Sequence, residues 1–383
     1  MLSTSDSTLE REINNLVDTL AIKTETSIKR NLVIEKINVM LSEIPEFKNM
    51  TVSIFGSTVN GLATENSDMD LCISSPEMGD ISDYKRSCLE NSSNSIFNMD
   101  FLANKLRSRG MSNITVVKKA RVPICTFRDQ QYGVDCDVNV NNCLGLENTS
   151  LIVEYTKLDL RVKPFLFALR LFVKSKGIHD CRKGFVGTYA YTMIGLHYLM
   201  FVLDQPVIPC LQKLSGAICK SPNCHFRTAK AITGYDVRYH DCVYIENTAS
   251  NSFISKLSVR CDDSTIWRSS NDKNVGELIT GVFLWLSSTR NILNPMSITS
   301  NGHIVREMKW RKHDAIFPDP FDLTRNIAGT CTAIGARVIC QEFEKAYYQL
   351  RRGSNFDSVL DVNDRVPRPT DPKSMEYRFG PRR

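Results

Sequence analysis

The stretch from Gly56 to Asp70 constrains the fold of this chain more than any other. It reads Gly-Ser-Thr-Val-Asn-Gly-Leu-Ala-Thr-Glu-Asn-Ser-Asp-Met-Asp and joins two apolar runs, one ending at Phe55 and the other beginning at Leu71. Two apolar runs joined by a glycine-containing segment predict two strands with a turn between them. Asp68 and Asp70 lie two residues apart, so on an extended strand both side chains face the same side.

A pair of carboxylates on one face favours the binding of a cation, because like charges repel each other. Gly56 and Ser57 can present backbone N–H groups and a hydroxyl to an anion. An anion cradle beside a carboxylate pair is what metal-dependent nucleotidyl transfer requires, usually with a third carboxylate. Asp135 and Asp137, both on one face of a strand predicted at 133–140, are candidates for that third ligand. Spacing alone does not choose between them.

Length, charge and cysteine content set broad limits. A chain of 383 residues has room for about two to three domains. The net charge of +6 is mild, so affinity for a polyanion would come from local basic clusters. No run approaches the roughly 18 uncharged apolar residues of a membrane helix, and the polar N-terminus is not typical of a signal peptide. The 13 scattered cysteines suit free thiols in a reducing compartment, and we expect the cytoplasm.

Apolar periodicity predicts a change in secondary-structure content near residue 150. Before it we expect a helical N-terminal region at 8–45, a helix at 97–109, and strands at 51–55, 69–74, 113–118, 122–127 and 133–140. After it we expect mainly helices, at 151–176 with Pro164 starting or kinking the second part, at 188–203 and at 275–286. The chain is therefore predicted to be α+β, with a small mixed sheet followed by a helical part.

Three local features add to this outline. Asn301-Gly302 predicts a hairpin turn within 298–313. Beyond Gly353 the chain is polar and proline-rich, which predicts an extended tail over 353–383. The run Cys219-x4-Cys224-His225 lacks a clear fourth zinc ligand, so we interpret it as a loop.

The Gly56–Asp70 stretch resembles the active-site motif of the polymerase-beta-like nucleotidyltransferases, and among them that of the non-canonical poly(A) polymerases and terminal uridylyltransferases. Further matches lie at Ala120–Ile124, Asp137–Asn142, Tyr155–Pro164, Gly276–Phe283 and Asp319–Ala328. The amino-acid sequence of Tyr155–Pro164 is more similar to that of the uridylyltransferases than to that of the poly(A) polymerases. The resemblance implies a two-lobed α+β fold with the nucleotide in the cleft between the lobes. It implies a catalytic domain at 36–154, a helical PAP-associated central domain from 1–35 plus 155–352, and a tail at 353–383.

The resemblance also implies roles for individual residues. It favours Asp137 as the third carboxylate, so that Asp68, Asp70 and Asp137 would hold two Mg²⁺ or Mn²⁺ ions while Asp135 stays structural. Lys174 falls at the position of a triphosphate lysine, and Arg170 where family members usually have another lysine. The nucleotide-binding residues implied are Gly56, Ser57, Asn142, Asn148, Thr149, Arg170, Lys174, Thr188, Tyr189, Asp319, Asp322 and Arg325.

Within this set, Asn148 and Thr149 are expected near the sugar 2′-OH and the base edge, and Asn142 near the ribose or the incoming 3′ end. Thr188-Tyr189 falls where the family has a serine–tyrosine pair whose hydroxyl touches phosphate and whose ring stacks on the base.

Arg325 departs from the uridylyltransferase pattern, which often has a histidine here that excludes adenine. An arginine offers only donors, so it can donate to O4 of uracil, whereas the N6 amine of adenine would leave donors facing donors. Asp319 or Asp322 could accept from N3–H of uracil or orient the arginine. The alternative is that Arg325 points out to RNA or to a neighbouring carboxylate.

These observations predict a template-independent RNA terminal uridylyltransferase that adds UMP from UTP to RNA 3′ ends and releases pyrophosphate. An RNA-binding or silencing protein is a further expected partner, and a membrane is not. One alternative is a non-canonical poly(A) polymerase that uses ATP. A second is an enzyme of the wider superfamily that acts on small molecules, against which the matches from 142 to 328 argue. A third is an inert RNA-binding pseudoenzyme or scaffold, against which the three aspartates argue.

Overall fold

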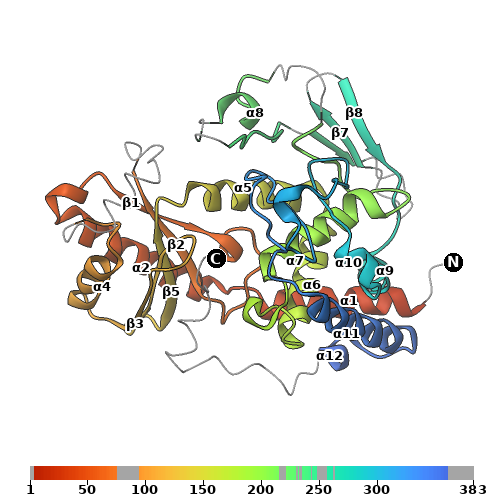
Figure 1. The fold of residues 1–383 in the computed structure, drawn as a ribbon, viewed down its shortest axis with the longest axis horizontal. Helices are drawn as coiled ribbons and strands as arrows, with labels where there is room; N and C mark the ends of the chain where they lie inside the picture. The colour runs from red at the N-terminus through yellow and green to blue at the C-terminus, as the bar shows by residue number, and fades with distance from the viewer. Residues whose placement is uncertain are drawn as a thin grey trace. The chain divides into compact units, whose positions relative to one another are not determined.

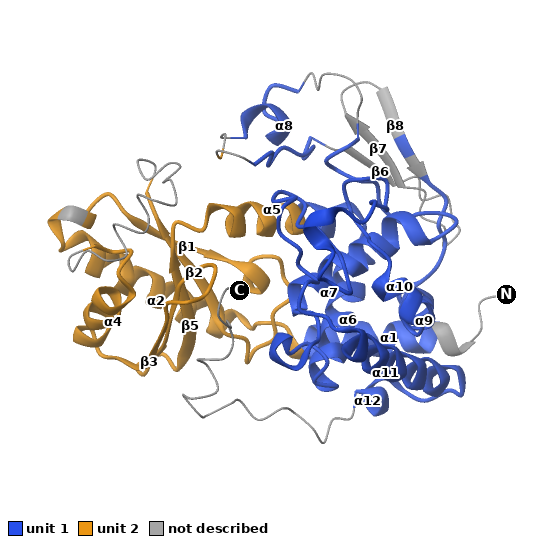
Figure 2. Ribbon diagram, viewed as in Figure 1, with its two compact units in different colours: residues 1–19, 154–231, 235–367 blue, residues 20–153, 232–234, 368–383 orange. Residues whose placement is uncertain are grey.

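The structure is a computed structural model that describes residues 4–75, 95–214, 221–229, 232, 235–242, 244–247, 257–261 and 264–360. The chain divides into two compact units (Figure 2). Unit 1 comes from residues 1–19, 154–231 and 235–367, and unit 2 comes mainly from residues 20–153. Within the described residues, no helix is both long and apolar enough to cross a membrane.

Unit 2 is built on a five-stranded mixed sheet in the order β1-β2-β5-β4-β3 (Figure 1). Its strands are β1 (Thr51–Phe55), β2 (Met69–Ser74), β3 (Met111–Val117), β4 (Ile124–Asp129) and β5 (Val134–Val140). Its helices are α2 (Thr24–Ser42), η1 (Pro45–Phe47), η2 (Gly56–Thr58), α4 (Met99–Ser108) and most of α5 (Cys143–Leu158). β2 and β5 run parallel and the other neighbouring pairs antiparallel, which confirms the mixed sheet.

The two faces of this sheet have different surroundings. α2 and α4 share one hydrophobic core with alternate strand residues, such as Leu71 of β2 and Val138 of β5. Because side chains alternate along a strand, the intervening residues point to the other face. Asp70 and Asp137 are two of these residues.

Unit 1 is mainly helical. It contains α1 (Thr4–Leu20), α6 (Val162–Ser175), η3 (Cys181–Lys183), α7 (Thr188–His197), the π-helical turn η4 (Tyr198–Val202), α8 (His225–Thr228), α9 (Val275–Leu286), α10 (Thr289–Leu293), η5 (Met308–Trp310), α11 (Ala333–Arg351) and α12 (Phe356–Val359). Its core is aromatic where α6, α9 and α11 meet. Phe172 lies 4.5 Å from Phe283 and 5.0 Å from Phe343, measured between ring centroids.

The N-terminal helical region is two helices rather than one, and they belong to different units. The break falls where Ala21 forms a bridge with Thr64 and the backbone N–H of Lys23 donates to Glu65 at 2.8 Å. α2 then packs on the sheet through Val33 and its neighbours. The expected grouping of residues 1–35 with the helical part is therefore wrong for α2, whose apolar stripe fits the sheet.

Other expectations differ in detail. Asn301 and Gly302 form the expected turn, with φ of 53° and 84°, but it closes only a single bridge from Met296 to His303. Residues Phe356–Val359 form α12 instead of an extended tail, because Phe356 is fully buried. Residues 361–383 lie outside the described part. A small antiparallel sheet was not expected at all, formed by β6 (Tyr244–Asn247), β7 (Leu257–Cys261) and β8 (Ser264–Ser269).

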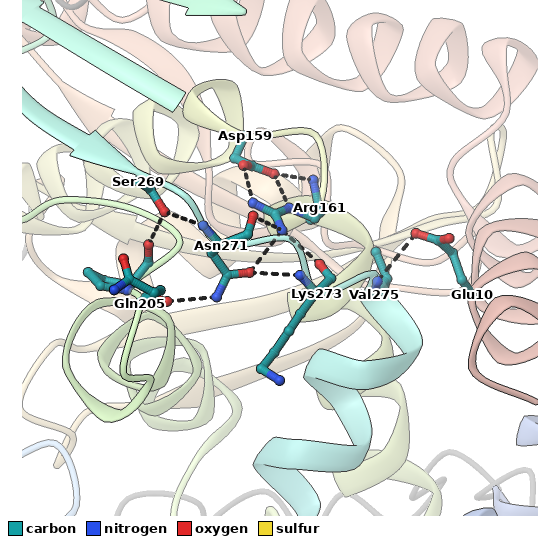
Figure 3. A network of polar contacts seen from close by, with 9 residues as sticks. Glu10, Asp159, Arg161, Gln205, Ser269, Asn271, Lys273 and Val275 are labelled. Atoms are coloured by element: carbon teal, nitrogen blue, oxygen red, sulfur yellow. Dashed lines mark hydrogen bonds and ion pairs between the residues drawn. The ribbon is translucent and has the colours of Figure 1, made fainter. Parts of the chain in front are cut away.

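A polar network ties the turn between α5 and α6 to the start of α9 (Figure 3). The Arg161 guanidinium binds both carboxylate oxygens of Asp159, at 2.9 and 2.8 Å. Its Nη1 continues to the carbonyl oxygens of Asn271 and Lys273, at 3.1 and 2.7 Å. The Asn271 amide donates in turn to the carbonyl of Gln205 at 2.6 Å. The run Tyr155–Pro164 thus contains residues that connect distant segments of unit 1.

We predict that Arg161→Lys lowers the free energy of unfolding by about 1.5–3 kcal/mol, because a lysine cannot fork between Asp159 and two carbonyl groups. Arg182→Lys is the matched control. Arg182 binds Asp180 in the same i, i+2 geometry at 2.9 Å, but it is more exposed. Urea unfolding of both variants checks this. Equal losses would show that the contacts to Asn271 and Lys273 add nothing.

Candidate active site

Asp70 and Asp137 lie at neighbouring positions on two adjacent strands. The parallel register of β2 and β5 pairs them directly, and adjacent strands are about 4.8 Å apart. Both side chains point to the sheet face opposite the core shared with α2 and α4. Two carboxylates this close repel each other unless a cation lies between them or one of them is protonated.

Asp135 lies on the same strand face but has a partner of its own. Its Oδ2 accepts a hydrogen bond at 2.6 Å from Nη1 of Arg128, which is directly opposite on β4. The residue opposite Asp137 on β4 is Thr126, which carries no charge. The ion pair with Arg128 fits the expectation that Asp135 is structural, and the role of Asp137 as the third carboxylate stays a prediction.

Asp68 lies two residues before Asp70, in the segment that immediately precedes β2. A site for two ions about 3.5–4 Å apart needs several carboxylate oxygens. The role of Asp68 as a ligand of such ions, together with Asp70 and Asp137, stays a prediction.

Gly56 forms a close contact with Asp70 that no other residue could make. Its φ is 70°, and a Cβ there would lie 2.4 Å from Oδ2 of Asp70. Its backbone N–H donates to Oγ1 of Thr149 at 2.9 Å, which holds the turn against α5. Ser57 follows in η2, and its carbonyl accepts from the N–H groups of Leu62 and Ala63. The glycine thus lets the Asp70 carboxylate pack directly against the backbone of the turn.

Arg30 is a residue of this site that the sequence analysis did not identify. It is 2 % exposed, and its guanidinium donates to Oγ1 of Thr58 at 2.5 Å and to the carbonyl of Ser67. Burial lowers the pKa of Arg30, while Asp68 and Asp70 are among the negative groups that raise it. The signal is its place on the apolar stripe of α2, where a charged residue needs a buried partner.

The donor set fits Mg²⁺ or Mn²⁺, because both cations prefer carboxylate oxygens. Asp68, Asp70 and Asp137 are the residues that would hold the ions. Asn139 lies on the same face two residues after Asp137, and its Oδ1 is buried without a hydrogen-bond partner. A buried acceptor on this face adds to the negative potential that would attract cations.

The residues after β5 have structural contacts of their own. Oδ1 of Asn142 accepts from the N–H of Gly145 at 3.3 Å, at the start of α5. Oγ1 of Thr149 donates to the Gly145 carbonyl at 2.7 Å and accepts from Gly56. Thr149 therefore links α5 to the glycine turn, and Asn148 beside it is 6 % exposed. Contacts of these residues with a ribose stay predictions.

In unit 1, Arg170 and Lys174 lie one turn apart on α6. The Arg170 side chain is buried, and its Nη1 donates to the Thr188 carbonyl at 3.4 Å and to Oγ1 of Thr192 at 3.2 Å. It therefore holds the first turn of α7, where Thr188 lies. Lys174 is less buried, in the last turn of α6. Phosphate contacts for either residue stay predictions.

Asp319 joins Tyr189 of α7 to Arg325. Its Oδ2 accepts from the Tyr189 hydroxyl at 3.2 Å and lies 3.6 Å from Nη1 of Arg325. The Arg325 guanidinium carbon lies 6.0 Å from the centroid of the Tyr189 ring. Burial, and secondarily the Asp319 carboxylate, raise the pKa of Tyr189 well above its usual value, so this phenol stays protonated at neutral pH.

The same loop fixes both of its aspartates. Oδ1 of Asp319 accepts from the backbone N–H groups of Phe321 and Asp322, at 3.1 and 3.2 Å. Oδ1 of Asp322 accepts from the Thr324 backbone at 3.0 Å and from the Thr324 hydroxyl. Asp319 is therefore the residue that orients Arg325, while Asp322 shapes the turn. The Arg325 side chain itself is 43 % exposed.

Comparison with known proteins agrees with this geometry. Residues 9–157 match the family described as poly(A) RNA polymerase, mitochondrial-like, central palm domain. Poly(A) RNA polymerase GLD2-B of Xenopus laevis is 24% identical over 82% of this chain and 55% of its own length. Terminal uridylyltransferase 7 of Homo sapiens is 26% identical over 88% of this chain and 20% of its own length. The chain thus spans about half or less of the length of these two relatives.

The fold is also that of a solved enzyme. The crystal structure of the Cid1 poly(U) polymerase superposes with a TM-score of 0.71 at 23% identity, over 94% of this chain and 99% of that one. The mixed sheet and the helices around it are shared. The chain is therefore similar to poly(A) RNA polymerases and terminal uridylyltransferases, and residues 9–157 match the family model of a poly(A) RNA polymerase central palm domain.

Proposed function

We propose that this chain is a template-independent RNA terminal nucleotidyltransferase that prefers UTP. The observation that carries the proposal is the register of β2 and β5, which sets Asp70 beside Asp137 on the sheet face opposite the core shared with α2 and α4. In the reaction the RNA 3′ oxygen forms a bond to the α-phosphorus of the nucleotide. The bond from that phosphorus to pyrophosphate breaks, and the proton of the 3′-OH is lost.

The residues of unit 2 bind and orient the reacting groups. Asp68, Asp70 and Asp137 would hold two Mg²⁺ or Mn²⁺ ions, which when bound activate the 3′-OH and neutralise the leaving pyrophosphate. Gly56 allows the close approach of Asp70 to the turn, and Ser57 offers a hydroxyl to a phosphate oxygen. Solved complexes of the related Cid1 contain MgATP and a UTP analogue, which supports a divalent cation here.

The residues of unit 1 select the base. Arg325 has donors only, and Asp319 fixes one end of it, so the guanidinium can present N–H groups to O4 of uracil. The half-buried Tyr189 ring offers a surface for stacking, and Lys174 a charge for the triphosphate. Both oxygens of Asp319 already accept hydrogen bonds or an ion pair, so they are poor acceptors for the amine of adenine.

The competing hypothesis is that the chain is a poly(A) polymerase with the same mechanism. It is favoured by relatives such as GLD2-B, whose name specifies poly(A). The two readings differ in what Arg325 does: in an ATP enzyme it would not face the base. The cysteines described are free thiols, which supports a reducing location such as the cytoplasm for either enzyme.

The first test concerns the carboxylates. We expect Asp70→Asn to lower extension of an RNA primer by about 10²-fold or more, because loss of one charge weakens the hold on both cations. Asp135→Asn is the matched control. Asp135 lies on the same face of the sheet as Asp70 but is paired with Arg128, so this variant should keep most of the activity. Primer extension with circular dichroism as a folding check measures both. Equal activity of the two variants would contradict the assignment.

The second test concerns the base. We expect Arg325→Ala to lower kcat/KM for UTP relative to ATP by about 10- to 100-fold, since a hydrogen-bonded base contact contributes about 1–3 kcal/mol. Arg337→Ala, an exposed arginine of α11, should leave the ratio unchanged. An unchanged ratio in Arg325→Ala, with ATP preferred throughout, would favour the poly(A) reading instead.

A further inference from the structure

We propose that Cys224, His240 and Cys242 of unit 1 bind a zinc ion. Within the described residues these three form a group whose ligand atoms all lie within 4.8 Å of one another. Cys224 and His240 are buried, at 1 % and 0 % exposure, and Cys242 is half-buried. Two thiols and an imidazole are a donor set that zinc prefers. We call these three residues the Cys224 cluster.

The spacing of the cluster fits a tetrahedral ion. Zinc binds sulfur at about 2.3 Å and imidazole nitrogen at about 2.0–2.1 Å, so ligand atoms in such a site are roughly 3.6 Å apart. Sγ of Cys224 lies 3.8 Å from Nδ1 of His240. This pair of donors is thus already close to zinc-binding distance, and Cys242 lies within 4.8 Å of both. They leave one position of the tetrahedron for a water molecule or another donor.

The surroundings hold the donors in place. The His240 ring stacks on Phe226 at 4.4 Å, and the His240 backbone N–H donates to the Leu211 carbonyl at 2.9 Å. The backbone N–H of His225 donates to Oδ1 of Asp241 at 2.7 Å, which joins the two segments that carry the ligands. Ligands oriented in this way by neighbouring contacts are typical of metal sites.

Neither Cys224 nor Cys242 forms a disulfide, so both thiols can bind a metal. Zinc binds cysteine as the thiolate, so binding displaces the two thiol protons.

The ion would join two short segments, one of which contacts the loop that carries Arg325. α8 follows Cys224 directly, and His240 and Cys242 end the second segment. Tyr239, next to His240, stacks on Phe321 at 6.3 Å, and the N–H of Phe321 donates to Oδ1 of Asp319. Zinc would therefore stabilise the scaffold of the loop that orients Arg325, without touching substrate.

The proposal differs from the interpretation of Cys219-x4-Cys224-His225 as a loop. Cys219 lies outside the described residues, and His225 is not part of the cluster. The proposed partners of Cys224 come from a separate segment, His240-x-Cys242, which the spacing within the run does not reveal.

The test is the metal content of the full chain, purified with reductant and without added metal. We expect about one zinc per chain by plasma mass spectrometry, and thiolate-to-cobalt charge-transfer absorption after exchange with Co²⁺. Cys224→Ser and Cys242→Ser should lose most of the zinc and that absorption. Cys340→Ser, which removes a buried thiol of α11 whose pKa burial raises to about 11, should keep both.

Two further measurements keep the result specific. Asp70→Asn should retain the zinc and the cobalt absorption, because Asp70 is not one of the proposed zinc ligands. If the cysteine variants do not fold, titration of the unmodified chain with a mercurial should release zinc in step with thiol loss, as a chromogenic chelator reports. Three outcomes would each overturn the proposal. The chain could contain no zinc and show no cobalt absorption, mass spectrometry could reveal a Cys224–Cys242 disulfide, or zinc could remain bound after both thiols are blocked.

Discussion

The repulsion between Asp70 and Asp137 is the constraint around which unit 2 is arranged. The strand register makes them neighbours, and no described lysine or arginine is opposite either one in the sheet. Two nearby arginines have hydrogen-bond partners of their own, Arg128 in Asp135 and Arg30 in Thr58. Such a pair costs stability in the absence of cations, and proteins keep such a cost mainly where it serves a function.

In unit 1, the contacts around Arg325 depend on Asp319. One buried carboxylate receives the Tyr189 hydroxyl, the Arg325 guanidinium and two backbone N–H groups. A carboxylate that accepts this many bonds is rigid, and it passes that rigidity to an arginine that is otherwise exposed. Selection of a base by a long side chain requires such a support, because a free arginine would not discriminate between bases.

Much of the fold follows from local patterns, and the site follows from them in part. The strands around Asp70 and Asp137 were predictable from alternation, and α9 from its apolar periodicity and the Asn274–Glu277 capping box. Other features depend on partners distant in sequence. The break at Ala21 needs Thr64 and Glu65, the ion pair of Asp135 needs Arg128 on the neighbouring strand, and the burial of Arg30 needs Thr58.

The most direct measurement of the central claim is pyrophosphate release by the purified chain, supplied with a single-stranded RNA, Mg²⁺ and each nucleoside triphosphate in turn. We predict release that depends on RNA, matches the nucleotides added to the 3′ end, and is fastest with UTP. Release that is fastest with ATP would contradict the uridylyl preference. A folded chain that releases no pyrophosphate with any nucleotide, in Mg²⁺ or Mn²⁺, would contradict the nucleotidyltransferase assignment itself.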